Sequence, residues 1–141
     1  AGYLDVLEKV GGFLRYDSAL SPRLSEMAIL ITARFWKAQY EWFAHEPHAL
    51  KGGLDPEIIK AISESRRPEN MQPDEEALYD FCTALHETHE VSDAVFQKAL
   101  DQFGQNGVID VIGLIGHYTG VSMTLNACQV EIPDGKENPL K

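Results

Sequence analysis

Apolar residues recur along this chain at intervals of three and four positions, which is the spacing that places them on one face of an α-helix. One such stripe consists of Leu24, Met27, Ala28, Ile31 and Phe35. No segment alternates apolar and polar residues with the period of two that marks a half-buried strand. The pattern therefore predicts an all-α fold without a sheet.

Capping residues, prolines and glycines set the expected bounds of the helices. Ser21-Pro22 and Asp55-Pro56 each combine a capping side chain with a proline at the first helical position, and Pro73 opens a longer helix. Gly11-Gly12 is expected to end a short first helix, with residues 13–20 as a connector. The expected helices span residues 3–10, 22–36, 40–50, 56–62, 73–90, 92–103 and 108–127.

Three interruptions are expected between or within these helices. Pro47 lies inside segment 40–50, where its missing N–H and its ring should break or kink the helix. Gly104 should end segment 92–103, and Asn106-Gly107 should form a turn. From Glu131 onward, prolines and a glycine predict a loose tail.

Segment 108–127 is apolar on nearly every side, which is typical of a helix buried in a core or between subunits. It is barely long enough to span a membrane and contains Asp110, His117 and Tyr118, so we expect a buried helix. Its three glycines would permit close contact with another helix. In a chain of 141 residues, these features favour an oligomer.

The charge and cysteine content narrow the range of partners and compartments. The chain carries 22 acidic and 12 basic residues, a formal net charge of −10, so we expect neither nucleic acid nor an anionic membrane as a partner. Residues 1–10 lack the basic and apolar regions of a signal peptide. Cys82 and Cys128 lie in apolar helical patterns and are expected to be reduced core residues of a cytoplasmic protein.

Polar and aromatic residues are densest between Gln39 and His48. Glu41 and His45 are four positions apart and share a helix face. A carboxylate beside an imidazole stabilises the imidazolium and sets its tautomer, which suits the pair for proton transfer. Tyr40 and Trp42 are candidates for the walls of a pocket. From the spacing alone, an ordinary exposed pair on a helix is the commoner explanation of Glu41 and His45.

Two stretches here resemble the core of the carboxymuconolactone decarboxylase family, within the alkylhydroperoxidase D-like (AhpD-like) superfamily. They are residues 21–34, SPRLSEMAILITAR, and residues 40–54, YEWFAHEPHALKGGL. The resemblance continues through residues 55–57, 91–94, 125–126 and 130–133. It covers residues 22–133 of a single expected domain, 1–141, and its most specific part is Tyr-Glu-Trp-x-x-His-Glu-Pro at 40–47.

The resemblance implies an AhpD-like bundle of six to seven helices that assembles into homotrimers or homohexamers. Decarboxylase members of the family remove CO2 from a carboxylated muconolactone in aromatic catabolism, without a cofactor. They carry a Glu-x-x-x-His element that Glu41 and His45 match. The context of Trp42, Pro47 and His48 differs from that branch, so the substrate need not be the same lactone.

The alkylhydroperoxidase D members instead carry Cys-x-x-Cys-x-x-x-His, and their two cysteines fall at Ala38 and Glu41 of this chain. A thiol peroxidase needs an accessible thiolate of low pKa and a resolving partner. Cys82 and Cys128 match neither position of the motif. A peroxidase of this type, with the peroxiredoxin activity that is ascribed to the family, is therefore a disfavoured alternative.

Other polar residues are candidates with open alternatives. His48 could join Glu41 and His45 in a metal site, but Pro47 disturbs their shared face and we expect no metal. His117 is either a core or interface histidine with satisfied hydrogen bonds or a residue of the same pocket.

Two arginines, Arg34 and Arg15, precede the cluster in sequence. Arg34 is a candidate to hold a substrate carboxylate, although an ion pair is the commoner role. Asn126 is a weaker candidate for the pocket, and His86 and His89 are expected to form a solvated helix end.

The leading hypothesis is a cytoplasmic, oligomeric, cofactor-free enzyme that acts on a small organic acid or lactone, and the resemblance implies a lyase. The catalytic residues would be Glu41 and His45, and the substrate-binding residues Tyr40, Trp42, His48, His117 and Arg34. A non-catalytic helical oligomer that binds a small ligand or a protein is the alternative from another class.

Overall fold

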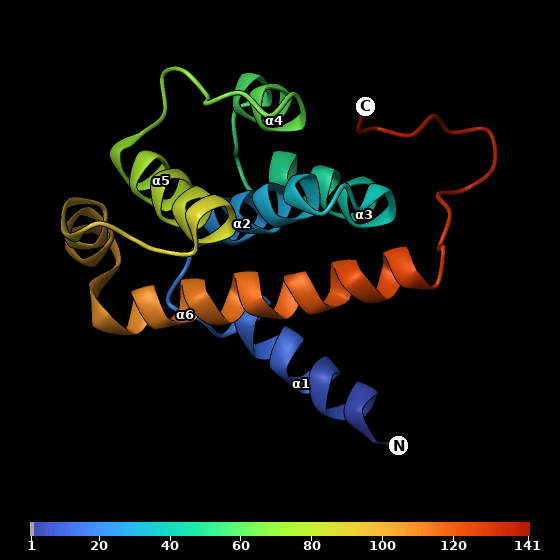
Figure 1. The fold of residues 1–141 in the computed structure, drawn as a ribbon, viewed down its shortest axis with the longest axis horizontal. Coiled ribbons are helices and arrows are strands. Elements are labelled where there is room, and N and C mark those ends of the chain that lie inside the picture. Colours follow the sequence, from blue (N-terminus) through green and yellow to red (C-terminus); the bar gives the residue numbers. More distant parts are fainter. Residues whose placement is uncertain (1) are drawn as a thin grey trace.

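The structure is a computed structural model that describes residues 2–141, and these residues form six α-helices and no strand (Figure 1). The helices are α1 (Tyr3–Tyr16), α2 (Pro22–Phe35), α3 (Gln39–Lys51), α4 (Pro56–Ser63), α5 (Pro73–Thr88) and α6 (Asp93–Ala127). The predicted all-α class is confirmed.

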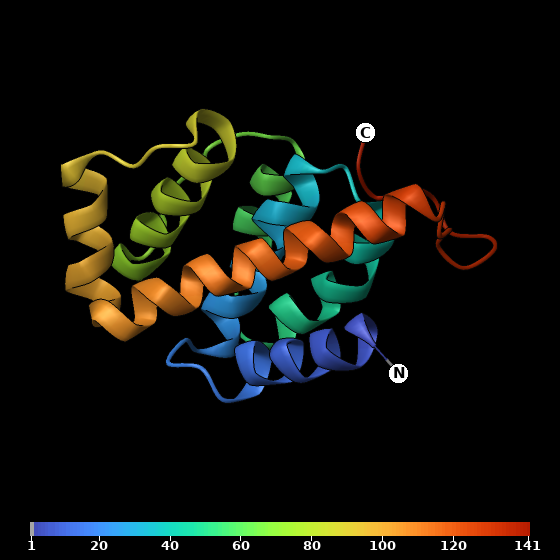
Figure 2. The same cartoon turned by 60° about the horizontal axis from the view of Figure 1, so that its bottom comes forward.

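Helix α2 forms the centre of the molecule. It contacts each of the other five helices, and every residue from Leu24 to Ala33 is buried. In Figure 1, α6 runs below α2 and α3, and α1 lies on the other side of α6. Figure 2 shows α6 crossing the body of the molecule, with α1 alongside it. A functional side chain on α2 therefore sits inside the bundle and can meet residues from α1, α3 and α6.

Local capping explains why the predicted helix starts are confirmed. Ser21, Asp55 and Ser92 each accept a hydrogen bond from a backbone N–H in the first turn of α2, α4 and α6. Proline occupies the first position of α2, α4 and α5. These signals act within four residues, so tertiary packing does not override them.

The first helix is longer than predicted. It continues through Gly11-Gly12 to Tyr16 instead of ending at Val10. A Cβ atom at Gly11 would lie 2.9 Å from Nε2 of His117 on α6. The glycine therefore serves a close approach between two helices, and the packing that this allows outweighs its low helix propensity.

The expected break at Pro47 is absent, because α3 is one helix from Gln39 to Lys51 with the proline inside it. The continuous helix keeps Glu41 and His45 one turn apart, on the same face. In α6 the break falls where Gly104 was expected to cause it. Gly104 has φ 69° and ψ 175°, a conformation that only glycine adopts readily, whereas Asn106-Gly107 is helical.

The second half of α6 is not buried all round. Val108, Val111 and Leu114 face the core, but Ile109 and Ile112 are 62% and 43% exposed. By length and composition α6 is the one helix among residues 2–141 that is apolar enough to cross a membrane, and 33% of its most apolar stretch is buried. A core helix with one uncovered face can have the same length and apolar composition.

Two expectations near the C-terminus are wrong. Cys128 is exposed rather than in the core, while Cys82 is buried as predicted, and both thiols are free. The tail forms no helix or strand, but it is not loose throughout. Leu140 is buried, and its backbone N–H and C=O both hydrogen-bond the side chain of Gln39, at 2.9 and 2.7 Å.

Candidate acid–base site

His45 lies between two buried carboxylates. Its Nδ1 is 2.7 Å from Oε2 of Glu26, and its Nε2 is 2.8 Å from Oε1 of Glu41. The three side chains are at most 9% exposed. Both ring nitrogens are therefore occupied by carboxylate oxygens in a region that excludes bulk water.

Three helices bring this cluster together. Glu26 belongs to the fully buried part of α2, and Glu41 and His45 approach it from α3. Arg15, in the last turn of α1, places Nη2 at 3.4 Å from Oε1 of Glu26. Four ionisable side chains thus form a chain of contacts in the order Arg15, Glu26, His45, Glu41.

The balance of charge in this cluster favours the protonated form of His45. Two carboxylates and one guanidinium leave one negative charge, which an imidazolium neutralises. Burial by itself lowers the pKa of His45. The hydrogen bonds and charges of Glu26 and Glu41 outweigh burial and raise the pKa to about 9. At neutral pH, His45 therefore donates a hydrogen bond from each ring nitrogen.

A cavity of about 550 Å³ lies beside the cluster, between α1 and α6. Leucines, valine and glycines line part of it, and its polar lining consists of Glu8, Arg15, Tyr16, His117, Tyr118 and Thr124. The ring of Tyr118 stands edge-on to His45, with 5.3 Å between centroids, and His117 stands edge-on to Tyr118 at 5.0 Å. Tyr118 therefore contacts the acid–base cluster and also lines the cavity.

Two buried polar atoms at this cavity have no hydrogen-bond partner among the described residues. They are Nε of Arg15 and Nδ1 of His117. Burial lowers the pKa of His117, and the charge of Glu41 opposes this effect, so the ring is neutral at pH 7. Leaving a buried donor or acceptor unpaired costs about 1–3 kcal/mol. A polar ligand or water in the cavity would recover that free energy.

The structure brings together three of the residues singled out from the sequence. Glu41 and His45 form the cluster, and His117 lines its cavity instead of being a core histidine with satisfied hydrogen bonds. Tyr118, whose ring contacts His45, is the residue that links the cluster to the cavity lining.

The other predicted site residues lie elsewhere. Trp42 is 1% exposed in the core, and its Nε1 donates to Glu46. Tyr40 is 37% exposed and His48 is exposed, and neither lines the α1–α6 cavity. Arg34 lines a different cavity, between α2 and α5.

No arrangement for a metal ion is evident at this site. Both nitrogens of His45 contact carboxylates, and His48 is 5.9 Å away between ring centroids. Across residues 2–141, no group of three or more His, Cys, Asp and Glu side chains is placed to hold a metal.

Sequence reasoning missed Glu26 and Tyr118. Glu26 is the single charged residue within the apolar stretch Leu24–Ala33. A charge at such a position almost never stays buried without a partner, and this was the available signal. Tyr118 carries no local signal, because its role comes from the crossing of α6 over α3.

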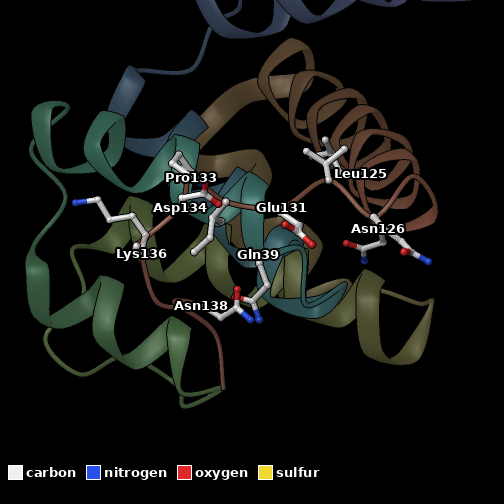
Figure 3. A pocket seen from close by; sticks show the side chains of 12 residues that line it. Gln39, Leu125, Asn126, Glu131, Pro133, Asp134, Lys136 and Asn138 are labelled. Atoms are coloured by element: carbon white, nitrogen blue, oxygen red, sulfur yellow. The ribbon is translucent and has the colours of Figure 1, made fainter.

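Asn126 lies at a third place in the molecule, where the C-terminal segment folds back toward the start of α3 (Figure 3). Its Nδ2 donates to the backbone oxygen of Trp36 at 2.8 Å. The cavity there has a volume of about 540 Å³ and is lined mainly by residues 129–138 together with Gln39 and Leu125. Asn126 is therefore not part of the His45 site.

A solved structure with the same arrangement of helices is a protein of unknown function from Agrobacterium tumefaciens, described as a putative antioxidant defence protein AhpD. The two chains superpose with a TM-score of 0.82 and 15% sequence identity, over 92% of this chain and 90% of that one. This chain thus has an AhpD-like helical fold. No protein-family model matches it, and no curated protein does.

Proposed function

We propose that this chain is a cofactor-free acid–base enzyme for a small organic acid or lactone, in the manner of the carboxymuconolactone decarboxylase family. The observation that carries the proposal is an imidazolium held between two buried carboxylates beside a cavity with an arginine. Such a group is a proton source next to a cavity, and a proton source is the minimum that a decarboxylation without a cofactor requires. We also propose a cytoplasmic location.

In the proposed reaction, Arg15 binds a carboxylate of the substrate, and the leaving CO2 takes none of the electrons of the broken C–C bond. The electron pair stays on the substrate as a carbanion or dienolate, which takes up one proton. His45 passes its Nε2 proton to Oε1 of Glu41 at 2.8 Å, and Glu41 delivers a proton to the substrate carbon. Solvent then reprotonates His45.

The test is turnover of a panel of small carboxylic acids and carboxylated lactones, followed as CO2 release and substrate loss. His45→Gln and Glu41→Gln should each lower turnover by about 10²–10⁴-fold, the usual contribution of a general acid. His48→Ala, an exposed histidine on the same helix, is the matched control and should keep full activity. Turnover that survives His45→Gln in a folded protein contradicts the proposal.

The likeness to a putative antioxidant protein supports a second candidate, reduction of hydroperoxides. The thiol chemistry of this chain argues against it. Cys82 is fully buried, and burial raises its pKa to about 12, so the reactive thiolate is scarce. Cys128 is exposed on its own near the end of α6. Peroxidase activity that disappears in a Cys82→Ala, Cys128→Ala double variant would establish this candidate.

A non-catalytic ligand-binding role remains the third candidate, because the unpaired polar atoms at the cavity fit a bound acid without turnover. A rise in melting temperature with one acid of the panel, without product, would favour it.

The proposed enzyme is a homo-oligomer, a trimer or hexamer as the family resemblance implies. Large apolar side chains are exposed on α1 and α6: Tyr3, Val6, Phe13, Ile109, Ile112 and Met123 are each 43–74% exposed. Apolar surface exposed on this scale is typical of a subunit contact.

A further inference from the structure

A second cavity, of about 360 Å³, lies on the side of α2 that faces α5. Ile31, Arg34 and Phe35 line it from one face of α2, and Tyr79, Thr83, His86 and Glu87 from one face of α5. Ile62 of α4 and Ser65, which follows α4, also line it. The buried isoleucines form an apolar floor below a polar rim, which is the usual make-up of a site for a small organic molecule.

The rim of this cavity is cationic in an otherwise acidic protein. Arg34 and Lys37 line it against a single carboxylate, Glu87, whereas the whole chain has a formal charge of −10. Lys37 adopts φ 49°, a left-handed conformation that is uncommon outside glycine. This left-handed residue directly follows the last turn of α2, as is common at helix ends, and the turn places the lysine at the rim.

Arg34 already binds oxygen atoms in this place. Its Nε donates to Oγ of Ser65 at 2.7 Å, and its Nη1 donates to the backbone oxygen of Lys141 at 3.0 Å. These two bonds leave the N–H donors of Nη2 without a partner among the described residues. A guanidinium fixed on one edge and open on another can hold a carboxylate without first being ordered.

One wall of the cavity is a pair of stacked rings. The rings of Phe35 and His86 are 4.8 Å apart between centroids, with 17° between their planes. Thr32 gives its hydroxyl hydrogen to the backbone oxygen of Ala28 at 3.0 Å, so it must accept from Nε2 of His86, also at 3.0 Å. His86 was expected in a solvated helix end, but it is half-buried, and this hydrogen bond and the stacking fix its ring against α2.

His86 adds an aromatic surface to the cavity and not a positive charge, because burial lowers its pKa. The contacts of Thr32 and Phe35 hold its ring before any ligand arrives. With Tyr79 on the α5 side, the cavity combines aromatic rings, an apolar floor and two cations.

We propose that this α2–α5 cavity is a second binding site, separate from the acid–base site, for a small planar carboxylate with an aromatic or conjugated body. The carboxylate pairs with Arg34 and Lys37, and the flat body lies among Phe35, His86 and Tyr79 over the isoleucine floor. The two cavities share no lining residue, so occupation of this one does not require the chemistry proposed at His45.

The test uses benzoate as the probe and benzamide as its neutral counterpart of the same shape, each titrated into the ¹⁵N-labelled chain at pH 7. Benzoate should shift the backbone signals of residues around Arg34, Ser65 and Thr83, and benzamide should bind at least about tenfold more weakly, because it lacks the charge-assisted hydrogen bonds. Absence of benzoate binding, or equal binding of both probes, overturns the proposal.

Two variants locate the binding. Arg34→Gln and Lys37→Gln should each weaken benzoate binding by about tenfold, and Lys37→Gln removes an exposed side chain that the fold does not need. Arg66→Gln, which removes a neighbouring exposed arginine outside the cavity, should leave binding unchanged. Shifts confined to Leu7, Gly11 and His117 would place benzoate in the α1–α6 cavity and overturn the proposal, with the acid–base function unaffected.

Discussion

At the scale of single residues, the site depends on the mutual neutralisation of four buried or half-buried charges. The contacts run from Arg15 to Glu26, then to His45 and then to Glu41. Together the four side chains carry no net charge when His45 is protonated. Removing one partner of a buried pair typically costs 3–5 kcal/mol, because the other charge is left uncompensated. The cluster is therefore a constraint on stability as well as the proposed source of a proton.

This coupling predicts a pH dependence of stability. The pKa of His45 is about 9 in the folded chain and about 6.5 in an unfolded one, so the folded state holds its proton more tightly. The resulting stabilisation, on the order of 3 kcal/mol, is complete below pH 6.5 and is lost as the pH rises from 6.5 to 9. Urea unfolding at pH 6, 7.5 and 9 measures it.

The control for that experiment is His45→Gln, which cannot titrate. Its free energy of unfolding should change much less than that of the wild type over the same pH range. A wild-type protein whose stability is flat between pH 6.5 and 9 would show that His45 is not held as an imidazolium.

The predictable part of the site is the part that a single helix determines. Glu41 and His45 were found from their spacing of four, since residues of one helix face must meet. Glu26 is 19 positions before His45, and their contact exists only because α2 packs on α3. For Arg34, closeness in sequence was misleading. It lies only seven positions before Glu41, yet it is on the side of α2 that faces α5 and not on the side that faces His45.

At the scale of elements, α1 shows how packing can reverse a local signal. Gly11-Gly12 predicted a helix end, but α1 continues for four residues beyond the pair and places Arg15 against Glu26. The starts of α2, α4 and α5 were predictable because their caps are local, whereas the end of α1 depends on His117, more than a hundred positions away.

The two glycines should respond differently to alanine. Nothing lies within 4 Å of a Cβ at position 12, so Gly12→Ala should stabilise the protein by roughly 0.5–1 kcal/mol through helix propensity. Gly11→Ala places a methyl group against the ring of His117 and should gain less, while shifting the His117 NMR signals. Thermal unfolding and a histidine spectrum of both variants measure this. Equal stabilisation, with His117 unmoved, would contradict the close approach.

At the scale of the whole molecule, the uncovered apolar surface of α1 and α6 is the main feature that a single subunit leaves unexplained. We expect this surface to be a subunit contact, so the protein should show a molar mass above the 15.7 kDa of one chain in light scattering after gel filtration. Ile109→Glu should reduce that mass, because burying an isoleucine at the contact stabilises the assembly by about 1.5–3 kcal/mol.

The matched variant is Gln102→Glu, which adds the same charge at an exposed position of α6 before the bend at Gly104. It should leave the assembly intact. A wild-type protein that elutes at the mass of one chain, at micromolar concentration, would show that the apolar surface is not a contact between copies.

The light anchoring of α1 has a consequence for how a substrate arrives. Gly11 and Leu14 are its buried residues, yet it forms one wall of the cavity and supplies Arg15. A helix held by so little buried surface lifts away at a fraction of the free energy of global unfolding. We therefore expect α1 to move away from α6 about residues 17–21 and so open the cavity to a substrate. A neighbouring subunit packed against the outer face of α1 would keep the cavity closed.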